Sequence, residues 1–145
     1  MKIAIATDHN GVNEKKEIME LMKNVEFVDY SPNNYDTDDY PDFAFKVAED
    51  VAAGKVDLGV LMCGTGIGMS IAANKVKGII CGHCSSVEQA HLTREHNHAN
   101  ILALSYKQAV PELVEMIREF LNTEPSKEER HNRRVNKILD YEKAR

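Results

Sequence analysis

Short runs of strand-forming residues alternate with helical patterns along most of the chain, and this alternation restricts the fold more than any single motif does. Strand character occupies residues 2–7, 25–30, 57–63, 78–84 and 100–105. Apolar residues at helical spacing follow these runs, at 13–24, 40–55, 67–76, 86–97 and 108–122. Repeated strand–helix units form parallel sheets with helices on both faces. The sequence therefore predicts an α/β fold with a five-stranded, mostly parallel sheet.

The end of the chain departs from this alternation. A charged helix is predicted there, in which Val135, Ile138 and Leu139 form a narrow apolar stripe. We expect residues 1–145 to form a single domain, with 126–145 as an extended helical tail that packs on a partner subunit. The sequence contains no linker or internal repeat that would divide the chain.

Composition narrows the classes of function. With 43% hydrophobic and 28% charged residues among 145, the chain is typical of a folded globular protein. A formal net charge of −5 argues against nucleic acid or an anionic membrane as partner, because no long-range positive field attracts either. No signal-peptide or membrane-span pattern is present. Three cysteines without a disulfide-scaffold spacing favour a reducing compartment, so we expect free thiols and a cytoplasmic protein.

Polar motifs follow three of the expected strands, at the points where those strands end. They are "TDHNG" at 7–11, "CGTGIG" at 63–68 and "HCSS" at 83–86. In parallel α/β sheets, ligands bind outside the carboxyl ends of the strands. The three motifs therefore predict one ligand site at this edge of the sheet.

The glycine-rich loop has an unusual spacing. Cys63 is followed by Gly64, Gly66 and Gly68, which gives the pattern G-x-G-x-G. A dinucleotide-binding loop needs its third glycine one residue later, where Met69 stands, and it follows the first strand rather than the third. A Walker loop needs a Lys–Ser or Lys–Thr pair that is missing, and a cysteine phosphatase loop needs an arginine in place of Met69. The spacing disfavours all three.

What remains is a thiol at the end of a strand, followed by backbone amides and the start of a helix. Amides and helix dipole favour negative charge there, and hence the thiolate form of Cys63. Such a thiolate can remove a proton from carbon while the amides stabilise the oxyanion of an enediolate. A small buried cysteine before a tight turn explains the same residues equally well at this point.

The remaining polar residues each have a functional and a structural interpretation. His9, after Asp8, can act as acid, base or phosphate ligand, or the pair can simply cap a helix. His96 and Asn97 end a predicted helix, where the dipole alone favours histidine. The histidines and cysteines between positions 81 and 98 lack the spacing of a zinc site, so no metal is expected.

The tail carries a basic face made by Arg130, Arg133, Arg134 and Lys137. Two arginines four residues apart can bind a phosphate bidentately, although a solvated basic face explains them too. Because the chain is acidic overall, a phosphate-sized ligand is favoured over nucleic acid.

Taken together, "TDHNG", "DYPDFA", "CGTGIGMSIAANK", "REHNHANILAL" and "ERHNRRV" resemble the ribose-5-phosphate isomerase B family, which includes the galactose-6-phosphate isomerase subunits. The resemblance runs from Lys2 to about Ile138. It implies a Rossmann-like three-layer α/β/α sandwich, no metal or organic cofactor, and a homodimer or tetramer with shared active sites. The implied reaction interconverts an aldose phosphate and a ketose phosphate, most directly ribose 5-phosphate and ribulose 5-phosphate, through a cis-enediolate.

The roles of the family's residues carry over to matching positions. Cys63 matches the base that moves the proton between C1 and C2, and Thr65 with His96 matches the pair that opens the furanose ring. The amides of Gly64, Gly66 and Gly68 match the enediolate-binding loop. The other matches are substrate-binding residues. Asp8 and Tyr40 match ligands of sugar hydroxyls, and Asn97 matches a residue that lines the pocket. The matches to phosphate ligands are His9, Lys107, Arg130 and Arg134, of which the two arginines would come from the partner chain.

Several positions depart from the family pattern. Ile80 stands where relatives usually have arginine. Lys107 replaces a phosphate-contacting arginine, and this replacement keeps the positive charge but loses the bidentate geometry of a guanidinium group. His83, His91 and His98 stand where histidine is unusual. The alternatives are therefore an isomerase of allose or galactose 6-phosphate, a non-catalytic phosphosugar-binding subunit, and a cysteine hydrolase or phosphatase.

Overall fold

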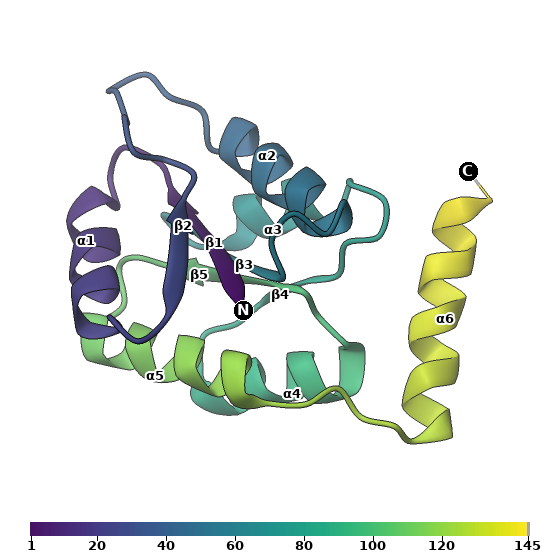
Figure 1. Ribbon diagram of the computed structural model, residues 1–145. Helices are drawn as coiled ribbons and strands as arrows, with labels where there is room; N and C mark the ends of the chain where they lie inside the picture. Colours follow the sequence, from purple (N-terminus) through teal and green to yellow (C-terminus); the bar gives the residue numbers. More distant parts are fainter. Residues whose placement is uncertain (145) are drawn as a thin grey trace.

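The computed structural model describes residues 1–144, which form one parallel sheet and six helices around it (Figure 1). The strands are β1 (Lys2–Thr7), β2 (Glu26–Asp29), β3 (Leu58–Cys63), β4 (Cys81–His83) and β5 (Ile101–Ser105). They lie in the order β2-β1-β3-β5-β4, and every neighbouring pair is parallel. The predicted α/β sandwich is confirmed, with a sheet that is wholly rather than mostly parallel.

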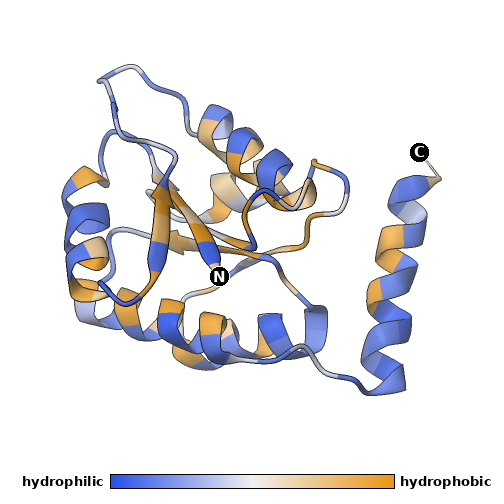
Figure 2. Ribbon diagram, viewed as in Figure 1, coloured by the Kyte–Doolittle hydropathy of each residue, from blue (hydrophilic) through white to orange (hydrophobic). Residues whose placement is uncertain are grey.

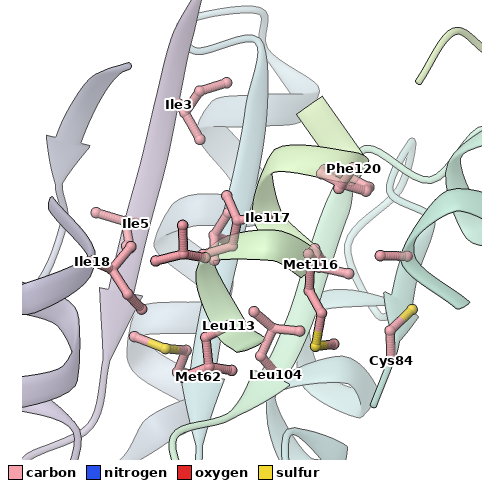
Figure 3. Packing of buried hydrophobic residues seen from close by; sticks show 14 of the residues in the cluster. Ile3, Ile5, Ile18, Met62, Cys84, Leu104, Leu113, Met116, Ile117 and Phe120 are labelled. Carbon is pink, nitrogen blue, oxygen red and sulfur yellow. The ribbon is translucent and has the colours of Figure 1, made fainter. Parts of the chain in front are cut away.

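Helices cover both faces of the sheet, and the last helix stands beside it (Figure 1). The helices of residues 1–144 are α1 (Val12–Leu21), α2 (Tyr40–Ala52), α3 (Ile67–Ala73), α4 (Val87–Asn97), α5 (Val110–Asn122) and α6 (Glu129–Lys143). One core cluster packs the sheet against α1, α4 and α5, and includes Ile18, Met116 and Phe120 (Figure 3). A second cluster packs the opposite face against α2 and α3, and its members are smaller, mainly alanine and valine. Every residue of β3 is buried, because this strand is the central one of the sheet and is covered by helices on both faces.

Two boundaries differ from the sequence expectation. The first helix ends at Leu21, which is 61% exposed, because the next residues turn and the amide of Val25 bonds the carbonyl of Met22. The fourth strand is only three residues long, since the amide of Ile80, just before it, donates to the side chain of Asn100 at 3.0 Å instead of to a strand carbonyl. Asn74 bonds both the amide and the carbonyl of Cys81, at 2.8 and 2.9 Å.

The tail helix α6 stands beside the body of the domain rather than on a face of the sheet (Figure 1). It packs on α4 through its buried residues His131 and Val135, while Ile138 is 54% exposed. Figure 2 shows that α6 is hydrophilic along most of its length, with a few apolar positions. No helix within residues 1–144 is both long and apolar enough to cross a membrane.

Candidate active site

The predicted site residues of β1, β3 and β5 lie at one edge of the sheet, because parallel strands end together. Thr7 pairs with Met62 in register, and Cys63 pairs with Ser105. The loops that follow these strands therefore begin at the same level, and they carry Asp8 and the glycine loop. Parallel pairing alone thus brings the "TDHNG" and "CGTGIG" motifs to neighbouring positions.

The loop after β3 folds back on the thiol of Cys63. The amide of Gly66 donates to the Cys63 Sγ at 3.2 Å, and the thiol is nearly buried, with 5% of the residue exposed. Gly66 has φ +82°, a left-handed conformation that side chains disfavour, and this turn aims its N–H at the sulfur. An N–H donor favours a negatively charged sulfur over a neutral one.

Neighbouring side chains fix the rest of this loop. Ser105 Oγ donates to the carbonyl of Gly64 at 2.8 Å, and the amide of Ile67 donates to Thr65 Oγ1 at 3.1 Å. The Nε2 of His83, at the end of β4, lies 2.8 Å from the carbonyl oxygen of Thr65. Thr65 is itself exposed, although its hydroxyl is held against the loop by this bond from Ile67.

His9 is held by a buried carboxylate. Its Nδ1 lies 2.7 Å from Asp38 Oδ1, and the same oxygen accepts the His9 amide at 3.0 Å. This hydrogen bond raises the pKa of His9 above its usual range. Burial opposes ionisation of Asp38, yet hydrogen bonds from Asn34 and His9 lower its pKa overall. The pair therefore favours an imidazolium with one ring nitrogen left for a ligand.

Asp8 and Tyr40 border the same edge. Asp8 is 9% exposed, and its carboxylate accepts the amide of Asn10 at 3.0 Å. Tyr40 begins α2 and lies directly over Gly68, where an added Cβ would come within 2.5 Å of the ring. The ring of Tyr40 can therefore lie beside the loop because Gly68 has no side chain.

Tyr106 belongs to the site although the sequence did not single it out. It directly follows β5, and its amide donates to the carbonyl of Cys63 at 3.3 Å. Its ring packs against Gly11, where a Cβ would lie 2.6 Å from Cδ2, and its hydroxyl lies over Gly64. Burial and the charge of Asp8 raise the pKa of its phenol, which therefore stays a neutral donor. Its position after a strand that ends at the predicted edge was the available signal.

His96, Asn97, Arg130 and Arg134 form a second group, away from the glycine loop. His96 stacks on His131 of α6, with ring centroids 4.3 Å apart, and its Nε2 lies 3.4 Å from Glu95. Burial, together with the charges of His96 and Arg130, lowers the pKa of His131. Arg130 pairs with Glu128 at 3.0 Å, and Arg134 is exposed.

Connectivity explains why the two groups are separate within one chain. Helix α4 begins beyond the carboxyl end of β4 and ends before the amino end of β5. The amide of Asn100 bonds the carbonyl of Ile80, which fixes the end of α4 beside the start of β4. His96 therefore lies at the opposite edge from Thr65, and no hydrogen bond or ion pair within residues 1–144 joins them. The expected Thr65–His96 pair does not form inside a single chain.

The cysteines and histidines outside the loop form no metal or redox site in the described chain. No cluster of three or more metal-ligating side chains occurs among residues 1–144. Cys81 and Cys84 are separated by two residues, but they pack into opposite faces of the sheet. Extended chain spans about 10 Å over three residues, too far for a disulfide. Burial raises the pKa of Cys81 to about 12 and that of Cys84 to about 11, so both are inert thiols.

Topology and site define a Rossmann-like α/β domain whose carboxyl edge carries a thiol loop in place of a nucleotide-binding loop. The chain belongs to the ribose/galactose isomerase family, because the model of that family matches residues 3–138.

Similar proteins agree with this placement along the whole chain. The chain is 48% identical to the putative sugar phosphate isomerase YwlF of Bacillus subtilis, over 98% of this chain and 97% of that protein. The structure of ribose-5-phosphate isomerase B from Clostridium thermocellum superposes with a TM-score of 0.93, at 43% identity and 99% coverage of both chains. That of Mycoplasma genitalium ribose-5-phosphate isomerase B with bound ribulose-5-phosphate gives 0.92, at 43% identity, over 99% of this chain and 97% of that one.

Proposed function

We propose that this protein is an aldose–ketose phosphate isomerase that interconverts D-ribose 5-phosphate and D-ribulose 5-phosphate. The observation that carries the proposal is the 3.2 Å contact from the Gly66 amide to the Cys63 sulfur. It places a backbone hydrogen-bond donor against the sulfur of the one residue of the loop that can act as a base. Isomerisation moves hydrogen between adjacent carbons without net oxidation, so the chemistry needs no redox cofactor.

In the proposed reaction, the Cys63 thiolate removes the proton from C2 of the open-chain aldose. The electron pair of that C–H bond forms the C1–C2 double bond, and the carbonyl oxygen O1 takes up negative charge and then a proton. Amides of the loop at Gly64, Gly66 and Gly68 stabilise this oxyanion. Return of the proton from Cys63 to C1, with loss of the O2 proton, gives the ketose. The cis-enediolate is the shared intermediate.

Substrate binding divides between hydroxyl and phosphate ligands. Asp8 and Tyr40 border the loop and are the proposed ligands of sugar hydroxyls. His9 is the proposed phosphate ligand, because its hydrogen bond to Asp38 favours the imidazolium. Lys107, two residues beyond β5, adds an exposed positive charge at the same edge.

The second group of residues completes the site from another subunit in this proposal. His96 would act with Thr65 of the neighbouring subunit in ring opening, Asn97 would line the pocket, and Arg130 with Arg134 would bind the phosphate. A homodimer is supported by apolar side chains left exposed on the two helices nearest these groups. They are Ile67 and Ile71 on α3, at 49% and 59% exposure, and Ile138 and Tyr141 on α6, at 54% and 74%.

A coupled assay of the purified protein with ribose 5-phosphate, allose 6-phosphate and galactose 6-phosphate tests the function. We expect turnover of ribose 5-phosphate with the highest kcat/KM, and loss of about 10³-fold in Cys63→Ala with phosphosugar binding retained. Preference for a six-carbon substrate would move the assignment to that sugar. Binding without turnover would make the chain a phosphosugar-binding subunit, and release of inorganic phosphate would make it a hydrolase.

A further inference from the structure

The peptide group between Thr65 and Gly66 has both of its polar atoms bound to side chains. Its N–H donates to the Cys63 sulfur at 3.2 Å, and its carbonyl oxygen lies 2.8 Å from His83 Nε2. A planar trans peptide directs its N–H and C=O in opposite directions. A partner that fixes the carbonyl therefore also fixes the direction in which the N–H points. His83, one peptide group and Cys63 form a continuous chain of contacts.

The imidazole of His83 is placed by its strand and by the loop. His83 ends β4, opposite Ala103 of β5, and it extends over the face that α3 covers. Its Cδ2 would lie 2.9 Å from a Cβ on Gly66, so the ring packs directly against the Gly66 backbone. Since a carbonyl oxygen only accepts, Nε2 carries a hydrogen and donates it to Thr65.

We propose that His83 is a positioning residue that acts on Cys63 through the Thr65–Gly66 peptide. This inference rests on the proposed role of Cys63 as the base. Donation to the carbonyl polarises the peptide and strengthens the bond from its N–H to the sulfur. It also keeps the left-handed turn at Gly66 in the orientation that points this N–H at Cys63. His83 thereby strengthens the hydrogen bond to the Cys63 sulfur without touching the substrate.

A purely structural role for His83 can be distinguished from a positioning role. The side chain is exposed, and the hydrogen bond that its imidazole makes within residues 1–144 is the one to the Thr65 carbonyl. Removing an exposed side chain of this kind changes folding stability little. The proposal instead requires a change in the chemistry of the thiol at position 63, in the absence of any substrate.

The test measures the rate at which iodoacetamide alkylates Cys63 at pH 7, followed by peptide mass spectrometry. Cys81 and Cys84 serve as internal references, since burial raises the pKa of each thiol to about 12 and about 11. We expect His83→Leu to slow alkylation of Cys63 about three- to ten-fold, the scale of one weakened charge-assisted hydrogen bond. His83→Gln, which restores an N–H donor, should recover most of the rate.

Isomerase kinetics and a control variant complete the experiment. His83→Leu should lower kcat with KM unchanged, because ground-state phosphate binding is not altered. His91→Leu removes a partly exposed imidazole that bonds Thr123, away from the loop, and should leave alkylation unchanged.

Three results would overturn the proposal. The first is a Cys63 alkylation rate in His83→Leu equal to that of the wild type, and the second is a rate in His83→Gln as slow as that in His83→Leu. The third is a slower rate in His83→Leu accompanied by a fall in Tm large enough to show that the fold is destabilised. If the wild-type protein isomerises no sugar phosphate, the proposed function fails, and the alkylation rates still decide the role of His83.

Discussion

His9 and Asp38 form a hydrogen-bonded pair, with Nδ1 and Oδ1 2.7 Å apart and only 2% of the Asp38 side chain exposed. Asn34 Nδ2 and the amide of Tyr35 donate to the second oxygen of Asp38, at 2.9 and 3.2 Å. The carboxylate is thus saturated with donors on both oxygens. The loop between β2 and α2 places this carboxylate against His9.

Replacing Asp38 with asparagine tests whether the pair binds phosphate through charge. The raised pKa of His9 keeps the imidazolium present above the ordinary value of 6.5, and Asp38→Asn removes the largest cause of this shift. We expect the ratio of KM in the variant to KM in the wild type to be several-fold at pH 7.5 and close to one at pH 5.5, where His9 is protonated in both proteins. Steady-state kinetics at the two pH values measure this ratio. An equal increase at both would show that Asp38 acts through loop structure instead.

The same pair sets a pH window for stability. His9, with its raised pKa, stabilises the fold fully below 6.5 and loses this contribution as pH rises through its folded pKa. Asp38, with a lowered pKa, contributes above 3.8 and loses this contribution as pH falls through its folded pKa. The stability difference between wild type and Asp38→Asn should therefore be largest between these two values. Urea unfolding across this range measures it.

Local patterns were sufficient to predict the sheet and the edge at which the loops meet. The buried run of β3 and the glycines after Cys63 predict a strand and a turn from neighbouring residues alone. Asp38, in contrast, lies in a polar loop whose composition resembles any solvated connection. Its role depends on a contact with His9, 29 residues away, and sequence spacing contains no information on such a pair.

Thr65 and His96 lie apart within one chain for a topological reason. Both residues match motifs, and motif matching does not specify the edge of the sheet at which each lies. The direction of α4 does, because a helix that connects parallel strands runs from the carboxyl edge back to the amino edge. From the sequence, His83 is a candidate metal ligand and a departure from the family pattern, whereas its contact with Thr65 depends on the register of β4 against β5.

Gly66→Ala should cost both stability and activity. Its φ of +82° disfavours a side chain, and the added Cβ would lie 2.9 Å from the backbone carbon of Leu104, which cannot move without disturbing β5. Gly54 is a matched control, with φ +75° and no atom within 4 Å of a Cβ. We expect Gly54→Ala to lower the free energy of unfolding by about 1 kcal/mol and Gly66→Ala by about 2–4 kcal/mol. Urea unfolding and kcat give the comparison, and equal costs would contradict the backbone clash.

Gly68→Ala should separate binding from stability. The Cβ would lie 2.5 Å from Cζ of Tyr40, but this contact is the far end of a partly exposed side chain that can swing away. The fold should therefore lose less than about 1 kcal/mol, while KM rises several-fold because Tyr40 no longer borders the loop. If Tyr40→Ala raises KM by the same factor and the double variant adds nothing further, the two residues act as one unit. Additive effects would contradict this.

The shared active site is tested by mixing inactive variants. Cys63→Ala disables the glycine-loop half of the site, and Arg134→Ala disables the tail half. In a dimer whose sites each combine both halves from different subunits, a mixed dimer has one site with both defects and one intact site. Coexpression of the two variants in equal amounts should then restore about one quarter of wild-type activity, since half of the dimers are mixed.

The control pairs Cys63→Ala with Thr65→Ala, whose positions are only two residues apart in the same loop. Every site in that mixture keeps one defect whichever subunit supplies the tail, so activity should stay at the level of the separate variants. Recovery in the first mixture but not in the second would show that Arg134 serves the glycine loop of the partner subunit. No recovery in either mixture would mean that Arg134 and Cys63 of one chain serve the same site, and that α6 must leave α4 to bring them together.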